Sequence, residues 1–97
     1  MMKKGYVLLQ VDVKDPEIFK EYPQLSEKII SKFGGKYLFR GGDFDALEGN
    51  WKYKRNVLVE FESVSKANEW YHSPDYQEAL KIRSKSASSN LIIIEGY

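Results

Sequence analysis

The sequence contains no cysteine, a single histidine and only three prolines in 97 residues. Without cysteine the chain can form no disulfide, and no thiolate can bind zinc or act as a nucleophile. The longest uninterrupted apolar run, Leu91–Ile94, is far shorter than the roughly 20 residues that a membrane-spanning helix needs. The apolar stretch after Lys4 is interrupted by Gln10 and Asp12, so it is too short for a secretory signal. These absences predict a cytoplasmic protein with no membrane partner.

No charge of one sign predominates, because 15 basic and 14 acidic residues leave a net charge of +1. A near-neutral chain is neither a nucleic-acid binder recognised by charge alone nor an acidic disordered tail. We therefore predict no nucleic-acid partner. Hydrophobic residues make up 42% of the sequence, which is enough for a packed core, and the length predicts a single domain over residues 1–97.

Hydrophobic periodicity predicts the secondary structure. Apolar residues alternate along Gly5–Val13, which is typical of a strand. Asp15 and Pro16 then supply a cap and a first-position proline for a helix, in which Pro23 predicts a kink or a short opening turn. The helical period predicts one buried stripe: Ile18, Tyr22, Leu25, Ile29 and Phe33.

The remaining elements follow from the same signals. They are a strand over Lys36–Arg40, a loop over Gly41–Asn50, a strand over Arg55–Phe61, a helix from Ser63 or Ser65 to about Tyr71, a helix from Ser73-Pro74, a serine-rich turn over Ser86–Ser89 and a strand over Asn90–Gly96. The order β-α-β-β-α-β is that of the split βαβ, or ferredoxin-like, arrangement. The sequence therefore predicts an α+β fold, a four-stranded antiparallel sheet with helices on one face.

Large apolar residues are expected on both faces of this sheet, although helices can cover only one. Those on the uncovered face are predicted to be Leu8, Leu38, Leu58, Ile92 and Ile94. Such a patch is unusually large for a surface exposed to solvent. We therefore predict a homodimer in which the helix-free faces of two copies pack together.

Several short motifs recur in a familiar order along the chain. They are Arg40-Gly41-Gly42, Leu47-Glu48-Gly49, Arg55, Glu60-Phe61, Trp70–Gln77, Arg83 and Ile94-Glu95-Gly96. Together they resemble the domain-of-unknown-function family 1330, within the dimeric α/β-barrel, ferredoxin-like superfamily. The resemblance covers essentially the whole chain and implies the fold and the dimer. It also implies a ligand between the sheet and the helices of each subunit, but it carries no established reaction.

Three arginines are candidates for binding an anionic ligand. Arg55 shares a strand face with apolar residues, and Arg83 lies on the inner side of its helix. An arginine that points toward a core needs an anion, which is either a structural carboxylate or an oxyanion on a ligand. Arg40 ends a strand before Gly41, where the glycines either form a tight turn or let backbone amides approach a ligand.

Other side chains are candidates for proton transfer or for lining a pocket. Glu48 and Glu60 are possible bases, and His72, the only histidine, is either an acid/base group, a haem ligand or a hinge residue. Tyr22, Tyr71 and Tyr76 either pack the helices onto the sheet or hold an aromatic ligand. No motif for zinc, nucleotide phosphate or a serine nucleophile is present.

These residues predict a cofactor-independent enzyme of the monooxygenase, isomerase or lyase type that acts on a small aromatic or carbonyl-bearing molecule. In it, Arg55 and Arg83 stabilise negative charge, and Glu60, Glu48 or His72 moves a proton. The alternative is a dimer that binds such a molecule, or serves in a stress response, without catalysis.

Overall fold

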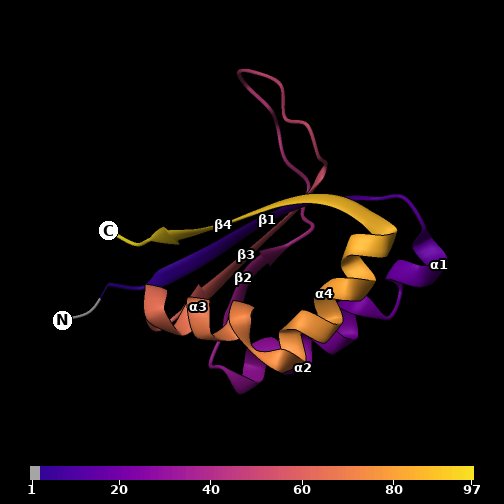
Figure 1. The fold of residues 1–97 in the computed structure, drawn as a ribbon. Coiled ribbons are helices and arrows are strands. Elements are labelled where there is room, and N and C mark those ends of the chain that lie inside the picture. The colour runs from indigo at the N-terminus through magenta and orange to yellow at the C-terminus, as the bar shows by residue number, and fades with distance from the viewer. Residues whose placement is uncertain (1–2) are drawn as a thin grey trace.

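The structure, a computed structural model, describes residues 3–97. Its elements are β1 (Gly5–Val13), α1 (Pro16–Phe19), α2 (Tyr22–Lys32), β2 (Lys36–Arg40), β3 (Arg55–Phe61), α3 (Val64–His72), α4 (Pro74–Ser86) and β4 (Ala87–Glu95). The strands form one antiparallel sheet in the order β2-β3-β1-β4. The helices cover one face, and the β2–β3 loop projects from the other (Figure 1). The predicted α+β, ferredoxin-like fold is confirmed.

The core lies between the helices and one face of the sheet. Odd-numbered residues of β1 and β3 point into it, as alternation predicts, so that Val7, Val59 and Phe61 are almost fully buried. The ring of Trp70 on α3 packs against Phe61 at 5.5 Å and against Tyr76 on α4 at 4.2 Å between centroids. These aromatic contacts fix both C-terminal helices against the sheet.

Serine caps set the start of both C-terminal helices. The Ser63 hydroxyl accepts a hydrogen bond from the Lys66 amide at 3.1 Å, and the Ser73 hydroxyl accepts one from the Tyr76 amide at 3.1 Å. The break predicted at Ser73 is therefore confirmed, and the cap positions Tyr76 at the first turn of α4.

We expect Ser63→Ala to lower the free energy of unfolding by about 1 kcal/mol, because the orphaned amide loses its side-chain acceptor. Denaturant unfolding followed by circular dichroism measures this change. Ser65→Ala is the matched control, since Ser65 lies exposed in the first turn of α3 and is not the cap. Equal effects of the two substitutions would contradict the capping role.

The first helical region differs from the prediction in its buried stripe. It divides into α1 and α2, with Pro23 in the first turn of α2, so the expected opening turn is confirmed. The buried face lies about one residue further along the chain than the predicted stripe. Ile18 and Leu25 are 43% and 37% exposed, and Phe33 is half-buried. Tyr22 and Ile29 are buried as predicted. Phe19, Ser26 and Ile30 are buried in place of the other predicted residues.

A bulge in β2 corrects the predicted faces of that strand. The register with β3 shifts between Tyr37 and Phe39, so Phe39 lies opposite Leu58 and Arg40 lies opposite Val57. One inserted residue reverses alternation beyond it. Phe39, predicted on the helix side, therefore joins the helix-free face, and Arg40 turns toward the helices.

The last strand is longer than predicted. Ser86 ends α4, and β4 begins at Ala87, so the serine-rich turn predicted over Ser86–Ser89 is wrong. The Ser86 hydroxyl donates back to the Ile82 carbonyl at 2.6 Å, which satisfies it inside the helix. Ser88 and Ser89 pair with β1, where backbone hydrogen bonding outweighs their low strand propensity.

On the helix-free face, one apolar row crosses all four strands. Cross-strand pairing places Phe39, Leu58, Leu8 and Ile92 side by side in that order. We call these four residues the sheet row. Phe39 and Ile92 are among the exposed large hydrophobic residues of the chain, as is Ile94. Among residues 3–97, no helix is long and apolar enough to cross a membrane.

Candidate ligand-binding site

An interior cavity of about 30 Å³ lies between the sheet and the helices. Its lining is mainly apolar and is listed here: Val7, Leu9, Val11, Phe19, Tyr22, Pro23, Ser26, Ile30, Tyr37, Arg40, Arg55, Val57, Val59, Trp70 and Leu91. This volume has room for about one or two water molecules, so a larger ligand has to widen the cavity. No carboxylate or histidine is among these lining residues.

Beside the cavity, two tyrosines and an arginine form a buried chain of hydrogen bonds. Arg83 Nη1 donates to the Tyr76 hydroxyl at 2.8 Å, and the hydroxyls of Tyr76 and Tyr22 lie 2.6 Å apart. All three side chains are buried, Arg83 to 5% exposure, and Tyr22 lines the interior cavity. The structure thus brings together three residues that the sequence predicted separately.

The donors and acceptors of this chain set its direction. Arginine only donates hydrogen bonds, so the Tyr76 oxygen accepts from Arg83. Among residues 3–97, the acceptor found for the buried Tyr76 proton is the Tyr22 oxygen. Leaving that proton unbonded would cost free energy, so Tyr76 donates to Tyr22. The Tyr22 proton then remains available for a group in the cavity.

Burial raises the pKa of Tyr76 well above the ordinary tyrosine value, with the neighbouring Tyr22 adding to the shift and the charge on Arg83 opposing it. Burial likewise raises the pKa of Tyr37, against a lowering contribution from Arg40. Both hydroxyls therefore stay protonated at neutral pH. Tyr76 and Tyr37 therefore serve as hydrogen-bond donors and not as phenolate bases.

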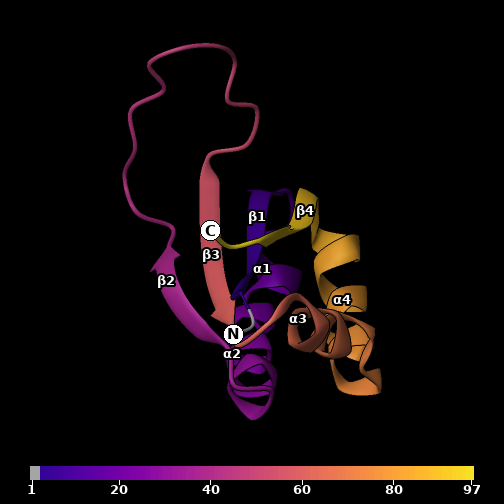
Figure 2. The ribbon, with the colours of Figure 1, turned by 90° about the vertical axis from the view of Figure 1, so that its left-hand side faces the viewer.

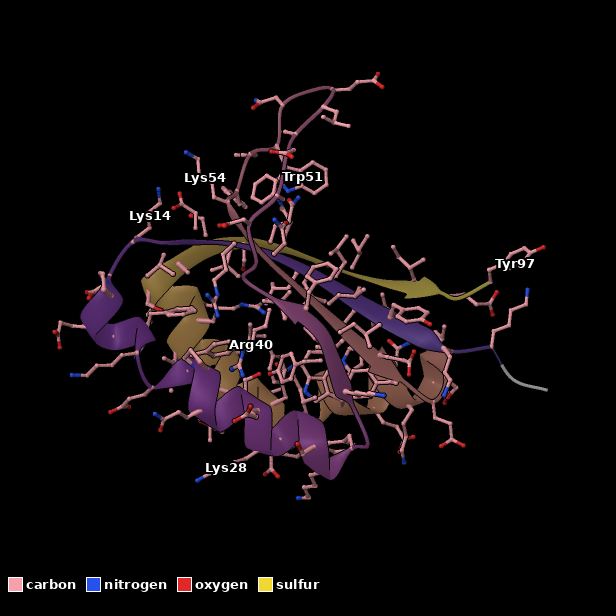
Figure 3. All side chains as sticks on the ribbon, turned by 180° about the vertical axis from the view of Figure 1, so that it is seen from behind. Lys14, Lys28, Arg40, Trp51, Lys54 and Tyr97 are labelled. Atoms are coloured by element: carbon pink, nitrogen blue, oxygen red, sulfur yellow. The ribbon has the colours of Figure 1, made fainter. Side chains whose placement is uncertain are left out.

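Arg55 lies where the interior cavity meets an open hollow at the end of the sheet. This mouth hollow, of about 400 Å³, is lined by Val11, Asp12, Val13, Gly41, Lys52, Lys54 and Arg55. Lys14 and Lys54 lie near the base of the β2–β3 loop, beside this end of the sheet (Figure 3). Asp12, the one acid in the lining, pairs with Lys14 at 2.7 Å. The mouth is therefore positively charged.

Gly41 gives Arg55 the space that it occupies. Its φ of 75° lies in the left-handed region, and a Cβ atom there would approach Arg55 Nη1 to 2.8 Å. The chain bends at Gly41, where β2 ends, and continues as a long loop until β3 begins at Arg55, so a tight turn is not formed. The absence of a side chain at Gly41 lets the Arg55 guanidinium lie close to the backbone.

Arg40 differs from the other two arginines because it is fully engaged within the chain. Its guanidinium donates to the Pro23 carbonyl at 2.8 Å and to Glu27 at 3.1 Å, and it lies 4.4 Å from the centre of the Tyr37 ring. Figure 3 shows it between β2 and α2. Among residues 3–97, the salt bridges found include neither Arg55 nor Arg83.

The predicted proton-transfer residues do not lie in the interior cavity. Glu60 is on the helix-free face, where it accepts from the Tyr6 hydroxyl at 3.1 Å. Glu48 is exposed in the β2–β3 loop, and His72 is exposed at the end of α3. Tyr71 is half-buried and packs against Trp70 at the edge of the aromatic cluster. The structure thus separates Glu60, Glu48 and His72 from Arg55 and Tyr22, whereas the ring of Tyr71 lies 5.7 Å from that of Tyr76.

Sequence reasoning did not select Lys52, Lys54, Ser26 or Tyr37. The two lysines line the mouth hollow because of the path of the β2–β3 loop, which hydrophobic periodicity does not predict. Their closeness to Arg55 in the sequence was a signal that could have identified them. Ser26 lies one helical turn after Tyr22 on the buried face of α2, and Tyr37, which precedes the β2 bulge, lies opposite the buried Val59. Among residues 3–97, no group of three or more acidic or histidine side chains could hold a metal ion.

Comparison with known proteins identifies a family and supports the fold. The family model described as "Domain of unknown function (DUF1330)" matches residues 4–97. A search of curated proteins finds no match.

Three solved structures are similar over nearly the whole chain. A protein of unknown function from Rhodopseudomonas palustris has a TM-score of 0.78 at 22% identity, covering 100% of this chain and 85% of its own. A dimeric ferredoxin-like protein of unknown function from Jannaschia sp. CCS1 has a TM-score of 0.76 at 14% identity, covering 95% and 98%. SnoaB, a cofactor-independent oxygenase from Streptomyces nogalater, has a TM-score of 0.67 at 9% identity, covering 98% and 94%. At these identities the likeness shows the fold alone.

Proposed function

We propose that this chain, which belongs to the DUF1330 family, forms a homodimer whose subunits each bind a small organic anion with an aromatic or carbonyl-bearing body. One observation carries the proposal. Arg55, at the junction of the cavity and the mouth hollow, has no carboxylate in salt-bridge contact among residues 3–97. A guanidinium in that position is suited to a carboxylate or enolate supplied by a ligand.

The surrounding groups favour the same ligand chemistry. Lys52 and Lys54 add positive charge at the mouth, and Tyr22 offers a proton toward the cavity. Apolar side chains line the space between them. We therefore place the anionic group of the ligand at Arg55 and its apolar body in the cavity, which widens as the ligand enters.

Catalysis without a cofactor is the second candidate, and the direction of the Arg83–Tyr76–Tyr22 chain favours it. Donors aimed at a site where negative charge develops stabilise an enolate-like intermediate. Arg55 and Tyr22 would supply those donors in a monooxygenase, isomerase or lyase reaction. Because Glu60, Glu48 and His72 lie outside the cavity, a proton moved at this site would pass to water at the mouth or involve Tyr22. Non-catalytic binding needs no such transfer.

We expect Arg55→Met to weaken binding of salicylate or benzoate about 10- to 150-fold, because one charge-assisted hydrogen bond contributes roughly 1.5–3 kcal/mol. Thermal-shift and calorimetric titrations with these anions, and with neutral benzamide, measure the effect. A bound ligand raises the melting temperature by mass action. Lys28→Met is the control, because it removes one positive charge from α2, away from the mouth (Figure 3).

Equal affinity for benzoate and benzamide, or equal losses in Arg55→Met and Lys28→Met, would contradict the proposal. Turnover distinguishes the two functions. Consumption of an aromatic dicarbonyl compound by the purified protein, lost in both Arg55→Met and Tyr22→Phe, would establish an enzyme. Binding without consumption would favour the non-catalytic function.

The homodimer is proposed to form through the helix-free face. Burying the sheet row and Ile94 removes several large apolar side chains from water, at about 1.5–3 kcal/mol for each one fully buried. Solved structures of the same fold include dimers, which supports this assembly. We further propose that the whole chain forms one domain. We also propose a cytoplasmic location, which cell fractionation would test.

A further inference from the structure

The β2–β3 loop, residues 41–54, carries apolar side chains that its own subunit does not cover. Leu47 is 89% exposed, more than any other leucine or isoleucine among the exposed large hydrophobic residues, and Phe44 and Trp51 are each 44% exposed. Figures 1 and 2 show the loop extending well beyond the sheet, on the side opposite the helices. A solvated loop of this length needs no such residues.

The base of this loop is held in a defined position. Trp51 Nε1 donates to Asn56 Oδ1 at 2.9 Å, and the Gly41 amide donates to the Asn56 carbonyl at 2.7 Å. Both ends of the loop are therefore tied to the same residue of β3. The loop leaves the sheet as an arm with a fixed base.

Between this arm and the sheet lies an open hollow of about 610 Å³. The apolar residues that line it are Leu8, Phe39, Phe44, Ala46, Leu47 and Trp51. Two of them, Leu8 and Phe39, belong to the sheet row. A second hollow of about 250 Å³ joins Trp51 to Leu8 and Ile92. The apolar surface of the arm is thus continuous with the face proposed to form the dimer.

We propose that residues 41–54 form a clasp that holds the second copy of this chain, with the partner's helix-free sheet face occupying the hollow. The inference rests on the proposed homodimer and adds a second contact to it. Continuity selects this occupant, because a copy seated on the sheet row necessarily meets the arm that rises beside it. Two-fold symmetry then gives each copy one arm and one hollow, so that the assembly closes as a dimer.

Leu47→Asp tests the clasp without disturbing the subunit. At 89% exposure, the Leu47 side chain contributes little to the folding of its own chain. We expect its substitution to raise the dimer Kd about 10- to 100-fold in sedimentation equilibrium, while the circular dichroism spectrum stays unchanged. Ile18→Asp is the matched control, since it replaces another exposed aliphatic residue, on the helix side. It should leave the dimer Kd unchanged.

Trp51 supplies an independent measurement. The chain has two tryptophans, and Trp70 is buried in the core, so a change in solvent exposure on assembly reports on Trp51. We expect the emission of the wild-type protein to shift to longer wavelength as dilution separates the dimer.

The outcomes separate the clasp from the dimer itself. A wild-type dimer whose Kd is unchanged by Leu47→Asp, or whose emission is unchanged by dilution, overturns the clasp and leaves the dimer standing. That is also the result expected if a different protein or a small apolar molecule occupies the hollow. A wild-type protein that is monomeric at all concentrations overturns both.

Discussion

Ile92→Asp is expected to convert the protein from a dimer to a monomer at micromolar concentration. Ile92 ends the sheet row on β4 and is 50% exposed in the isolated chain. In the subunit, water reaches an aspartate at this position, so the fold loses little. In a face-to-face dimer, the same carboxylate is buried against apolar side chains without a partner.

The size of this effect follows from the cost of burying charge. An uncompensated buried charge is destabilising by about 3–5 kcal/mol, and two-fold symmetry places one in each copy. The dimer Kd should therefore rise by more than about 100-fold, since each 1.4 kcal/mol is a factor of ten. Sedimentation velocity across a dilution series measures this shift directly.

Leu25→Asp is the control for Ile92→Asp. Leu25 is 37% exposed on α2, on the opposite side of the sheet, so its replacement adds the same charge without touching the sheet row. We expect this variant to remain dimeric. An Ile92→Asp protein that sediments as a dimer would show that the copies associate through another surface.

Local sequence signals were sufficient for much of this fold. Alternation in β1 and β3 placed Val7, Val59 and Phe61 in the core, because those strands pair without a register shift. Ser63 and Ser73 marked the two C-terminal helices, because a cap acts on the amides of its own first turn. Where the determining contact is local, or the period is uninterrupted, the sequence alone predicted the structure.

The errors arose where one residue changed the phase of a pattern. In α2, the buried residue one turn after Tyr22 is the polar Ser26 and not the apolar Leu25. In β2, one inserted residue exchanged the expected faces of Phe39 and Arg40. Periodicity carries no record of such an insertion, because each half of the element still alternates correctly. Packing decides where the insertion falls, and packing depends on residues distant in the chain.

The inward direction of the arginines in the candidate site could be predicted from the sequence, but the contacts between the site residues could not. Arg55 and Arg83 could be assigned inward directions from their places on a strand and a helix. The contact between Tyr22 and Tyr76 joins residues 54 positions apart, and only the packing of α2 against α4 creates it. Strand parity places Glu60 and Arg55 on opposite faces, so the prediction that both act in one site conflicted with the pattern of their own strand.

Tyr76→Phe is expected to lower the free energy of unfolding by about 3 kcal/mol, because it leaves a buried arginine without its hydroxyl acceptor. Arg83 is 5% exposed, and its Nε already lacks a partner among residues 3–97. Removing the Tyr76 oxygen strands the Nη1 proton as well. For a domain of this size, the loss corresponds to a fall in melting temperature of roughly 15 °C at constant protein concentration.

Two further variants identify the cause. Arg83→Met removes the buried charge together with its need for a partner, so it should destabilise the protein less than Tyr76→Phe does. Tyr71→Phe is the matched control, because Tyr71 belongs to the same aromatic cluster, with 5.7 Å between its ring centroid and that of Tyr76. If Tyr71→Phe costs as much as Tyr76→Phe, the loss reflects ring packing and not the stranded arginine.

The pH dependence of stability at alkaline pH provides a second test of the Tyr76→Phe variant. Burial, mainly, raises the pKa of Tyr76 above the value of 10.0 expected in the unfolded chain. Above that pH the unfolded chain loses this proton while the folded chain keeps it, so the unfolded state binds fewer protons and stability falls as pH rises. A phenylalanine ring has no hydroxyl to titrate, so the Tyr76→Phe variant should lose less stability than the wild type between about pH 9 and pH 11. Tyr6 and Tyr37, whose pKa values are also raised, contribute equally to both proteins. Parallel pH profiles for the two proteins would contradict a Tyr76 hydroxyl held protonated in the core.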